Sequence, residues 1–303
     1  MTMNMQEFKV FKDQNNSNLK FDFSLKNLNW MNIGGSAKVF FKPENLKELI
    51  SFLKIVPKYK KHVLGAGSNL LISEKLGEKI FIKLGKNFSN ISLIDDNKLI
   101  AGCSSLDKNV SDFACENGLS GLEFLSCIQG SVGGGIRMNS GCFGSEFKDF
   151  LVSIQVVDFE GKVSSIRTKD IIFGYRECNL PYDLIFLSAT FECKKNKKEL
   201  IKKEIERLKK LKESSQPLRV KTGGSTFKNP VKSTERKVWE LIRESVPEDI
   251  SFGDAKISSK HSNFFVNSKN ASFSEMNKLI NFVKDEVKKK TGISLDLEIE
   301  IIE

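Results

Sequence analysis

The stretch Gln129-Gly-Ser-Val-Gly-Gly-Gly-Ile-Arg-Met-Asn-Ser-Gly-Cys-Phe-Gly144 contains six glycines in sixteen residues. Glycine loses more conformational freedom on folding than any other residue, so this density indicates a backbone that turns tightly or approaches another group closely. A flexible linker would lack large apolar residues, whereas this run contains Val132, Ile136 and Phe143. Two interpretations stay open: a closely packed structural turn, or a loop whose backbone cradles a phosphate.

The familiar phosphate-binding sequences do not account for this run. No lysine follows the glycines as in a P-loop, and the Gly-x-Gly-x-x-Gly pattern of dinucleotide-binding folds is absent. A second glycine turn, Gly65-Ala-Gly-Ser-Asn69, comes directly after the apolar residues Val63 and Leu64. Successive backbone N–H groups in such a turn can bind an anion. Two loops of this kind could together hold a pyrophosphate.

The composition of the 303-residue chain, 40% hydrophobic and 28% charged, is typical of a globular protein of two or three domains. No run of 18 apolar residues exists, and the first ten residues lack the apolar core of a signal peptide. We therefore expect a cytoplasmic protein without membrane insertion. The six cysteines form no Cys-x-x-Cys pair and lie far from both histidines, which predicts free thiols and no metal site.

The net charge of +10 does not predict nucleic-acid binding, because most of it lies in one segment. Residues 194–214 hold ten basic and four acidic residues, and this difference gives +6 of the +10. Basic residues interleaved with aromatic ones, which would indicate a nucleic-acid surface, are not found there. The segment instead predicts an amphipathic helix with a solvated lysine face, because its apolar residues recur at helical spacing: Leu200, Ile201, Ile205, Leu208 and Leu211.

Short β-type segments outnumber helical ones before residue 193, which predicts an α+β fold class. The basic helix marks the boundary between a region of residues 1–193, with subdomains of roughly 1–80 and 81–193, and a C-terminal domain of residues 194–303. In that domain, Ser272 and Glu275 predict a capping box for a helix from about 273 to 290. Residues 293–302 predict a strand, because apolar and polar residues alternate strictly over the first nine of them.

Three residues of the C-terminal domain are candidates for chemistry, and spacing alone does not decide their roles. Ser225 lies in a third glycine cluster, Thr222-Gly-Gly-Ser-Thr-Phe-Lys-Asn-Pro230, and could be an ordinary turn serine. Lys260 could be surface charge. Glu298 shares the polar face of the predicted last strand with other acidic residues, and exposed strand carboxylates are usually solvated.

The motifs of the chain, taken in order, resemble those of the UDP-N-acetylenolpyruvoylglucosamine reductase family of flavoenzymes. The resemblance runs from about residue 20 to the C-terminus, and it rests on eight motifs in the right order rather than on any single one. These are Asn32-Ile-Gly-Gly-Ser-Ala37, Gly65-Ala-Gly-Ser-Asn-Leu-Leu71, Gly121-Leu-Glu-Phe124, Gly130–Gly144, Tyr175-Arg176, Gly224-Ser-Thr-Phe-Lys-Asn-Pro230, Lys260-His-Ser-Asn-Phe-Phe-Val-Asn267 and Leu297-Glu-Ile299.

The resemblance implies a FAD-binding half of the vanillyl-alcohol-oxidase (PCMH) type in two subdomains. A C-terminal α+β substrate-binding domain would follow, with a last strand that reaches the active site. It further implies non-covalent FAD, NADPH as co-substrate without a nucleotide fold of its own, and a small UDP-sugar substrate. We expect a monomer or weak oligomer. The residues implied in FAD binding are Gly34, Gly35, Gly65, Ala66, Gly67, Ser68, Asn69, Gly130, Ser131, Gly133, Gly134, Asn139 and Gly141.

The resemblance also implies three catalytic residues. A hydride would pass from NADPH to the flavin and then to the vinyl carbon of an enolpyruvyl ether, and negative charge would develop on the adjacent carbon and carboxylate. Arg176 suits the stabilisation of this charge, because its guanidinium stays charged and can meet a carboxylate in bidentate fashion. Glu298 would assist it, and Ser225 would donate the proton that completes the reduction. Substrate-binding roles fall to Tyr175, Lys228, Asn229 and Lys260.

The chain departs from the family pattern in places: Gln129 replaces a proline, Asn139-Ser-Gly-Cys-Phe143 replaces Asn-Ala-Gly-Ala-Tyr and so loses a phenol, and Cys178 replaces a serine. The segment between Arg176 and Ser225 is short, as in the family branch that lacks an extra tyrosine loop. Two alternatives remain. Another FAD-dependent oxidoreductase of the same fold would be favoured by a histidine for covalent FAD attachment. A catalytically inactive UDP-sugar or nucleotide-binding module is disfavoured, because the three catalytic residues are retained together.

Overall fold

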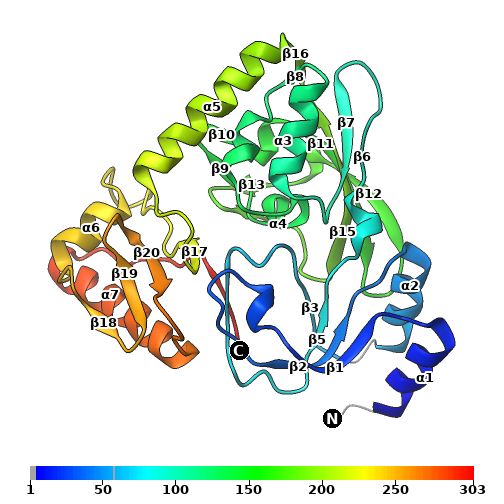
Figure 1. Cartoon of the computed structure of the whole chain (residues 1–303), viewed down its shortest axis with the longest axis horizontal. Coiled ribbons are helices and arrows are strands. Elements are labelled where there is room, and N and C mark those ends of the chain that lie inside the picture. The colour runs from blue at the N-terminus through cyan, green and yellow to red at the C-terminus, as the bar shows by residue number, and fades with distance from the viewer. Residues whose placement is uncertain (1–4, 57–58) are drawn as a thin grey trace. The chain divides into compact units, whose positions relative to one another are not determined.

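The computed structural model describes residues 5–56 and 59–303 (Figure 1). The described chain forms two compact units, and each is built from three separate segments. The first unit comprises the chain up to Asp22, Lys38–Ala66 and Glu78–Lys212, and the second comprises Phe23–Ala37, Gly67–Gly77 and Glu213–Glu303. The boundary at residue 194 between a FAD-binding and a substrate-binding domain remains a prediction. In the structure, the basic helix up to Lys212 belongs to the first compact unit.

The N-terminal part of the first unit is a mixed four-stranded sheet with the order β1-β2-β5-β3. Strands β2, β5 and β3 are parallel, and two helices lie beside this sheet in blue in Figure 1. Aromatic side chains fill the space between sheet and helices, with the rings of Phe41 and Phe52 stacked at 4.0 Å. The elements are α1 (Met5–Asn15), β1 (Leu19–Ser24), β2 (Ser36–Phe41), α2 (Leu46–Ile55), β3 (Lys61–Val63) and β5 (Ile80–Ile82).

The rest of the first unit is built on an antiparallel five-stranded sheet with the order β12-β11-β15-β7-β6. Its core is apolar and includes the buried rings of Phe147 and Phe191. The sheet strands are β6 (Ile91–Leu93), β7 (Lys98–Gly102), β11 (Leu151–Asp158), β12 (Val163–Arg167) and β15 (Leu184–Glu192). Around them lie α3 (Asp107–Glu116), α4 (Val132–Arg137), α5 (Lys198–Ser215) and the 3₁₀ turns η2 (Lys86–Ser89), η3 (Glu123–Cys127), η4 (Phe147–Asp149) and η5 (Thr168–Asp170).

Three two-stranded ribbons complete the first unit, and two of them carry predicted site residues. Strand β8 (Leu119–Ser120) pairs with β16 (Lys194–Lys195). The hairpin β9 (Gly141–Cys142) and β10 (Ser145–Glu146) closes the glycine-rich segment. The hairpin β13 (Phe173–Gly174) and β14 (Glu177–Cys178) contains Arg176 in its turn.

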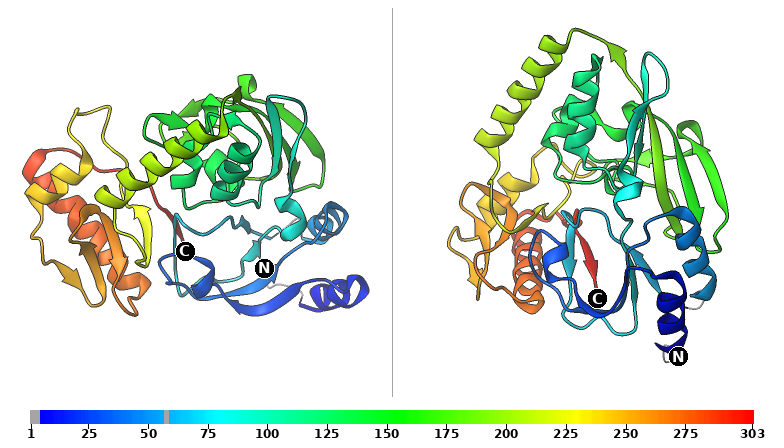
Figure 2. Two further views of the ribbon diagram at one scale, coloured as in Figure 1. Left: turned by 45° about the horizontal axis from the view of Figure 1, so that its top comes forward. Right: turned by 45° about the vertical axis from the view of Figure 1, so that its right-hand side comes forward.

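The basic segment forms helix α5, but the helix begins later than predicted. Its first lysines pair with β8 as strand β16, so the helix starts at Lys198 rather than at residue 194. Ile201 and Ile205 pack with Cys115 of α3, and Figure 2 shows α5 in yellow-green alongside α3. Leu200 and Leu211 are 50% and 41% exposed, since they lie about 100° around the helix from the buried stripe.

The second unit has the antiparallel sheet β17-β20-β19-β18, covered by α6 and α7. Its apolar core also takes Met31, Ile33 and Leu71 from the two early segments. The elements are η1 (Lys26–Leu28), β4 (Leu70–Ile72), β17 (Thr222–Ser225), α6 (Val238–Ser245), β18 (Ser251–Phe252), β19 (Ala255–Ser258), β20 (His261–Asn267), α7 (Phe273–Thr291) and β21 (Glu300–Ile302). With both units mixing helices and strands, the predicted α+β class is confirmed.

Two predictions for the end of the chain have different outcomes. The capping box of α7 is confirmed, because Ser272 Oγ accepts the Glu275 N–H at 3.2 Å and the Glu275 carboxylate accepts the Ser272 N–H at 2.8 Å. The prediction of a long last strand is wrong. Only Glu300–Ile302 form a strand, parallel to β4, because the preceding residues bond to a different segment near Phe227.

Candidate functional site

The two glycine-rich loops of the first unit lie side by side, as the paired-loop hypothesis requires. Gly65 follows β3, and Ser131 and Gly134 lie at the start of α4. A Cβ added to Gly65 would stand 2.7 Å from Ser131 Oγ and 3.8 Å from the backbone nitrogen of Gly134. A larger residue at position 65 would therefore press against the Ser131 hydroxyl, whereas the Gly134 backbone nitrogen lies at ordinary contact distance.

The residues at this junction fit an anionic cofactor group. Ser131 Oγ is buried and has no hydrogen-bond partner within residues 5–56 and 59–303. A buried hydroxyl without a partner costs free energy, so it indicates an acceptor or donor supplied from outside the chain. A Cβ on Gly134 would meet no atom closer than Ser131 Oγ at 3.7 Å, which leaves room beside the hydroxyl. An orphaned hydroxyl beside an open glycine is the arrangement that a phosphate oxygen would complete.

Lys83 is a cation at this junction that the sequence analysis missed. It follows β5 directly, and its Nζ donates to the carbonyl of Gly65. Burial lowers the pKa of Lys83, and the charge of nearby Lys42 lowers it further. Two lysines that repel each other are a favourable environment for an anion. The signal in the sequence was a lysine at the carboxyl end of a buried parallel strand, where ligands of such sheets collect.

Gly130 is constrained by a buried carboxyl group. A Cβ at Gly130 would lie 2.5 Å from Oδ2 of Asp107, which is fully buried at the first turn of α3. Burial raises the pKa of the Asp107 carboxyl well above its ordinary value. The Asp107 N–H also donates to the Gly130 carbonyl at 3.1 Å, so the start of the glycine-rich segment is fixed against α3.

The predicted glycines of the second unit have packing reasons of their own. A Cβ on Gly35 would overlap the carbonyl of Glu74, and one on Gly67 would overlap the carbonyl of Leu28. Gly67 also has a φ of 73°, which other residues rarely adopt. The structure thus explains these glycines without a cofactor. Roles in FAD binding remain predictions for them and for Gly34, Ala66, Ser68, Asn69, Gly133 and Gly141.

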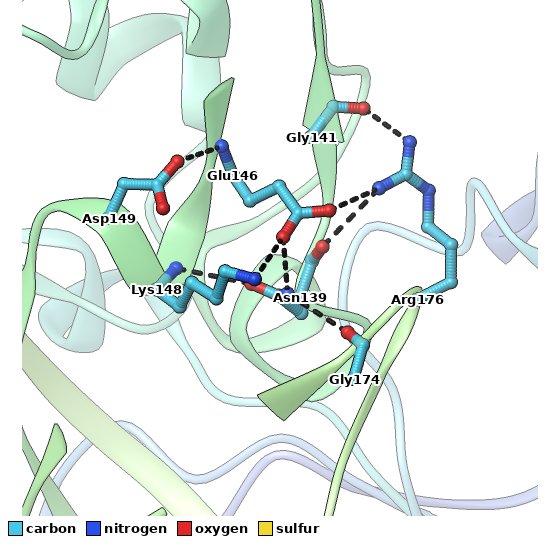
Figure 3. Close-up of polar contacts among 7 residues, drawn as sticks. All are labelled: Asn139, Gly141, Glu146, Lys148, Asp149, Gly174 and Arg176. Carbon is cyan, nitrogen blue, oxygen red and sulfur yellow. Dashed lines mark hydrogen bonds and ion pairs between the residues drawn. The ribbon is translucent and has the colours of Figure 1, made fainter. Parts of the chain in front are cut away.

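Arg176 lies in the two-residue turn between β13 and β14, and its guanidinium turns back onto the glycine-rich segment (Figure 3). Nη2 donates to the Gly141 carbonyl at 2.6 Å, and Nη1 donates to the Asn139 carbonyl at 3.5 Å. The ring of Tyr175 lies 5.0 Å from the guanidinium carbon. Arg176 has a φ of 59°, and left-handed backbone at a non-glycine residue clusters at functional sites.

Asn139 ties the Arg176 turn to the glycine-rich segment. It is fully buried, and its Nδ2 donates to Glu146 Oε2 at 3.0 Å and to the Gly174 carbonyl at 3.1 Å. Its Oδ1 accepts the Lys148 N–H at 3.1 Å. The side chain expected to contact FAD is therefore used inside the protein, and any flavin contact of Asn139 stays a prediction.

In the second unit, the structure brings Ser225 and Glu298 into neighbouring backbone segments. The Glu298 N–H donates to the carbonyl of Thr226 at 2.9 Å, and Asn69 Nδ2 donates to the Glu298 carbonyl at 2.9 Å. Glu298 is half-buried, whereas Asp296 is exposed. Bonds on two sides hold the backbone of Glu298 against the unit, and the role of its carboxylate stays a prediction.

Asn263 fixes the segment that follows Ser225, and the sequence analysis did not single it out. Its Oδ1 accepts the Phe227 N–H at 3.0 Å, and its Nδ2 donates to the Phe227 carbonyl at 2.8 Å. Asn263 is 2% exposed, so solvent does not compete for these bonds. An asparagine inside an apolar strand was the available signal, since buried amides are normally fully bonded.

The predicted substrate-binding residues of the second unit are more scattered. The Lys228 N–H bonds the carbonyl of Asp296 at 2.9 Å, next to Glu298. Asn229 Oδ1 accepts the N–H of Val238, the first residue of α6, at 3.0 Å. Lys260 is exposed, and its Nζ donates to the carbonyl of Glu213 at 2.5 Å. These contacts give Asn229 and Lys260 structural roles, and their contacts with substrate stay predictions.

The three departures from the family pattern lie at positions that are at least partly exposed. Phe143 is 44% exposed in the β9–β10 turn, where Phe143 and Gly144 have φ values of 52° and 89°. Gln129 is exposed, and Cys178 is half-buried at the end of β14. All six cysteines are free. Within the described ranges, no group of three or more His, Cys, Asp or Glu side chains could hold a metal ion, and no helix is long and apolar enough to cross a membrane.

Comparison with known families gives matches to both halves of the chain. A family model described as "FAD binding domain" matches residues 37–167. A second model, described as "UDP-N-acetylenolpyruvoylglucosamine reductase, C-terminal domain", matches residues 216–302. The two matches cover both glycine-rich loops, the Ser225 segment and the last strand.

Similar proteins cover the chain almost end to end. A UDP-N-acetylenolpyruvoylglucosamine reductase of Pelagibacter ubique (strain HTCC1062) is 56% identical over 301 residues, which are 99% of this chain and 100% of the relative. A protein of the same name from Rickettsia bellii (strain RML369-C) is 43% identical over 283 residues, 93% of this chain and 92% of the relative. The crystal structure of the reductase from Thermus caldophilus superposes with a TM-score of 0.81 at 29% identity, covering 95% and 99% of the two chains.

Proposed function

This chain belongs to the UDP-N-acetylenolpyruvoylglucosamine reductase family, and from that premise we propose which of its residues hold the cofactor, stabilise charge and donate a proton. The protein is a FAD-dependent oxidoreductase of peptidoglycan synthesis. It uses NADPH to reduce the enolpyruvyl group of UDP-N-acetylglucosamine enolpyruvate to UDP-N-acetylmuramate. The end-to-end match to the Pelagibacter reductase carries this conclusion. The FAD-binding half is of the vanillyl-alcohol-oxidase type, as the sequence predicts.

The junction of the two glycine-rich loops would hold FAD. Gly134 leaves room for a pyrophosphate close to the backbone, and the Ser131 hydroxyl would bond one of its oxygens. Lys83 and Lys42 would offset its negative charge. When bound, FAD supplies the hydride that it receives from NADPH. The chain itself supplies the position of the substrate, the charge stabilisation and the proton.

Arg176 would stabilise the negative charge that develops on the substrate carboxylate during hydride addition. A guanidinium keeps its charge at every physiological pH, and prepositioned cations are most effective where charge appears in the transition state. The turn geometry supports this role, because Arg176 is held by backbone carbonyls of the glycine-rich segment and is 17% exposed. Tyr175, directly before it, would pack against the bound substrate.

Ser225 would donate a proton to the carbon next to the carboxylate and would be reprotonated from water. Glu298 would assist in stabilising the developing enolate. The positions of both residues support these roles, because they lie in adjoining segments that are held by asparagine side chains. Asn263 bonds the backbone of Phe227 in the Ser225 segment, and Asn69 bonds the backbone of Glu298. Rigid placement of a proton donor is what general acid catalysis needs. Lys228 and Asn229, which follow in the same segment, would bind the anionic groups of the UDP-sugar.

The same proposal places the reaction in the cytoplasm and makes the protein a monomer or weak oligomer. Six free cysteines, four of them buried, suit a reducing compartment. NADPH and UDP-sugars are highly charged small molecules that do not cross membranes unaided. Gel filtration of the purified protein with light scattering would measure the oligomeric state directly.

An anaerobic titration of the purified protein tests the proposed activity. The flavin absorption should bleach when NADPH is added and should return when the enolpyruvyl UDP-sugar follows. UDP-N-acetylglucosamine without the enolpyruvyl group serves as the control and should leave the flavin bleached. Bleaching without recovery by the enolpyruvyl compound would point to a different acceptor. A colourless protein that binds no FAD would point to a binding module instead.

A further inference from the structure

The carboxylate of Glu146 lies at the centre of the polar cluster around Arg176 (Figure 3). Its Oε1 is 3.6 Å from Nη1 of Arg176. Its Oε2 accepts Asn139 Nδ2 at 3.0 Å and is 2.9 Å from Nζ of Lys148. Glu146 thus contacts the proposed charge-stabilising residue directly and, through Asn139, the hairpin that carries it.

The local backbone keeps this carboxylate in place. The Glu146 N–H donates to Asp149 Oδ2 at 2.8 Å in the capping box of η4, and Glu146 ends the β9–β10 hairpin. The Glu146 side chain is 23% exposed and that of Arg176 is 17% exposed, so solvent competes only partly for the ion pair. A surface ion pair is worth little, whereas a partly buried one with further hydrogen bonds restricts both partners.

Arg176 needs such a partner because its chain position alone does not fix its guanidinium. The residue stands at a turn with a φ of 59°, and a long side chain at a turn can adopt many rotamers. Carbonyls of Asn139 and Gly141 accept on one edge of the guanidinium, and the Glu146 carboxylate adds the charged contact. Together these groups hold the planar cation in a single orientation.

We propose that Glu146 is a positioning residue of the reductase, which holds the Arg176 guanidinium in the orientation that meets the substrate carboxylate. This inference rests on the proposed role of Arg176. The Glu146 carboxylate lies between two cations, 2.9 Å from Lys148 Nζ and 3.6 Å from Arg176 Nη1.

Glu146→Gln and Glu146→Ala test the proposal through the two half-reactions. Misplacement of a catalytic group by about 1 Å costs roughly 100-fold, so reoxidation of the reduced flavin by the enolpyruvyl substrate should slow roughly 10- to 100-fold. Flavin reduction by NADPH should stay within about twofold of the parent. Stopped-flow absorbance measures both rates, and Glu146→Gln keeps the side-chain volume should the alanine variant fold poorly. Unchanged reoxidation in Glu146→Gln would overturn the proposal.

Lys148→Gln is the matched control, because it removes the other cation of the same carboxylate and leaves the Oε1 contact with Arg176 intact. Its reoxidation rate should stay within about twofold of the parent. A loss equal to that of Glu146→Gln would mean that the cluster acts only as a structural network, and it would overturn the positioning role. Thermal melts and FAD content of Glu146→Gln and Lys148→Gln should match the parent.

A double-mutant cycle with Arg176→Ala separates this inference from the proposed function. If Glu146 acts through Arg176, Glu146→Gln should cause no further loss in the Arg176→Ala background, whereas independent effects would multiply. Multiplicative losses would overturn the inference and leave the role of Arg176 standing. If Arg176→Ala alone leaves reoxidation unchanged, the proposed function of Arg176 fails first.

Discussion

Single residues show how far sequence patterns reach into a site. Glycine density indicated two loops that approach another group closely, and the two loops do lie together, since a Cβ at Gly65 would stand 2.7 Å from Ser131 Oγ. Lys83 and Glu146 were not predicted as site residues. Their importance comes from partners that are distant in the sequence, Gly65 and Arg176. A charged residue on a surface strand and one in a site look alike until the fold places their neighbours.

Gly134 and Gly67 should respond differently to valine. A side chain at Gly134 would enter the open space beside Ser131 Oγ, so Gly134→Val should fold but retain little FAD. At Gly67 a side chain would overlap the Leu28 carbonyl at a φ of 73°, so Gly67→Val should lower the free energy of unfolding by several kcal/mol. Flavin absorbance per protein and urea unfolding check the pair. A Gly134→Val protein with full FAD content would contradict the proposal that FAD binds beside Gly134.

Ser225→Ala should slow one half-reaction selectively. Flavin reduction by NADPH needs no proton from Ser225, so its rate should stay near that of the parent. Reoxidation by substrate should slow roughly 10²- to 10⁴-fold, as is typical when a positioned general acid is lost. Ser225→Cys should recover part of the rate, since a thiol also donates a proton. Equal slowing of both half-reactions would instead assign Ser225 to shaping the turn.

At the scale of elements, local signals predicted helices better than strands. The sequence signal for the capping box of α7 lies within four consecutive residues, and the prediction was confirmed. The observed last strand, β21, is shorter than the predicted one, because residues 296–298 bond to the segment around Thr226 rather than to β4. Helix α4 inside the glycine-rich run was not predicted at all, since three consecutive glycines disfavour a helix. Contacts with residues 103 and 105 stabilise its start.

The α7 cap gives a prediction for this scale. Ser272→Ala removes the side-chain acceptor of the Glu275 N–H, and it should lower the free energy of unfolding by about 1 kcal/mol. Ser274→Ala is the matched control, because Ser274 is exposed within the same first turn of the helix. It should be neutral or slightly stabilising, since alanine is the better helix former. Urea unfolding of both variants decides, and equal losses would argue against the capping role.

At the scale of the whole molecule, the sequence predicted two functional halves but not the path of the chain between compact units. Family models match residues 37–167 and 216–302, and the division at residue 194 stays a prediction. The compact units instead interleave, because Phe23–Ala37 and Gly67–Gly77 join the C-terminal segment. No periodicity signals such an exchange, since apolar residues in a short segment do not reveal which core they enter.

A C-terminal fragment should therefore not fold like the intact protein. Residues 213–303 alone lack Met31, Ile33 and Leu71, which are buried in the core of the second unit. Loss of three large apolar side chains from one core costs about 6–15 kcal/mol, which is as large as the whole free energy of unfolding of a typical domain, about 5–15 kcal/mol. Thermal melting followed by near-UV circular dichroism should show no cooperative transition for the fragment. A sharp transition like that of the full chain would contradict the shared core.

The interleaved path of the chain also determines the order in which the segments of the second unit are synthesised on the ribosome. Phe23–Ala37 and Gly67–Gly77 emerge early, while Glu213–Glu303, which completes their core, is made last. At roughly 5–20 residues per second, this leaves a gap on the order of ten seconds. During the gap, Met31, Ile33 and Leu71 belong to a core that does not yet exist. The nascent chain is then most exposed to aggregation, and chaperone binding to its early apolar segments would be of greatest use.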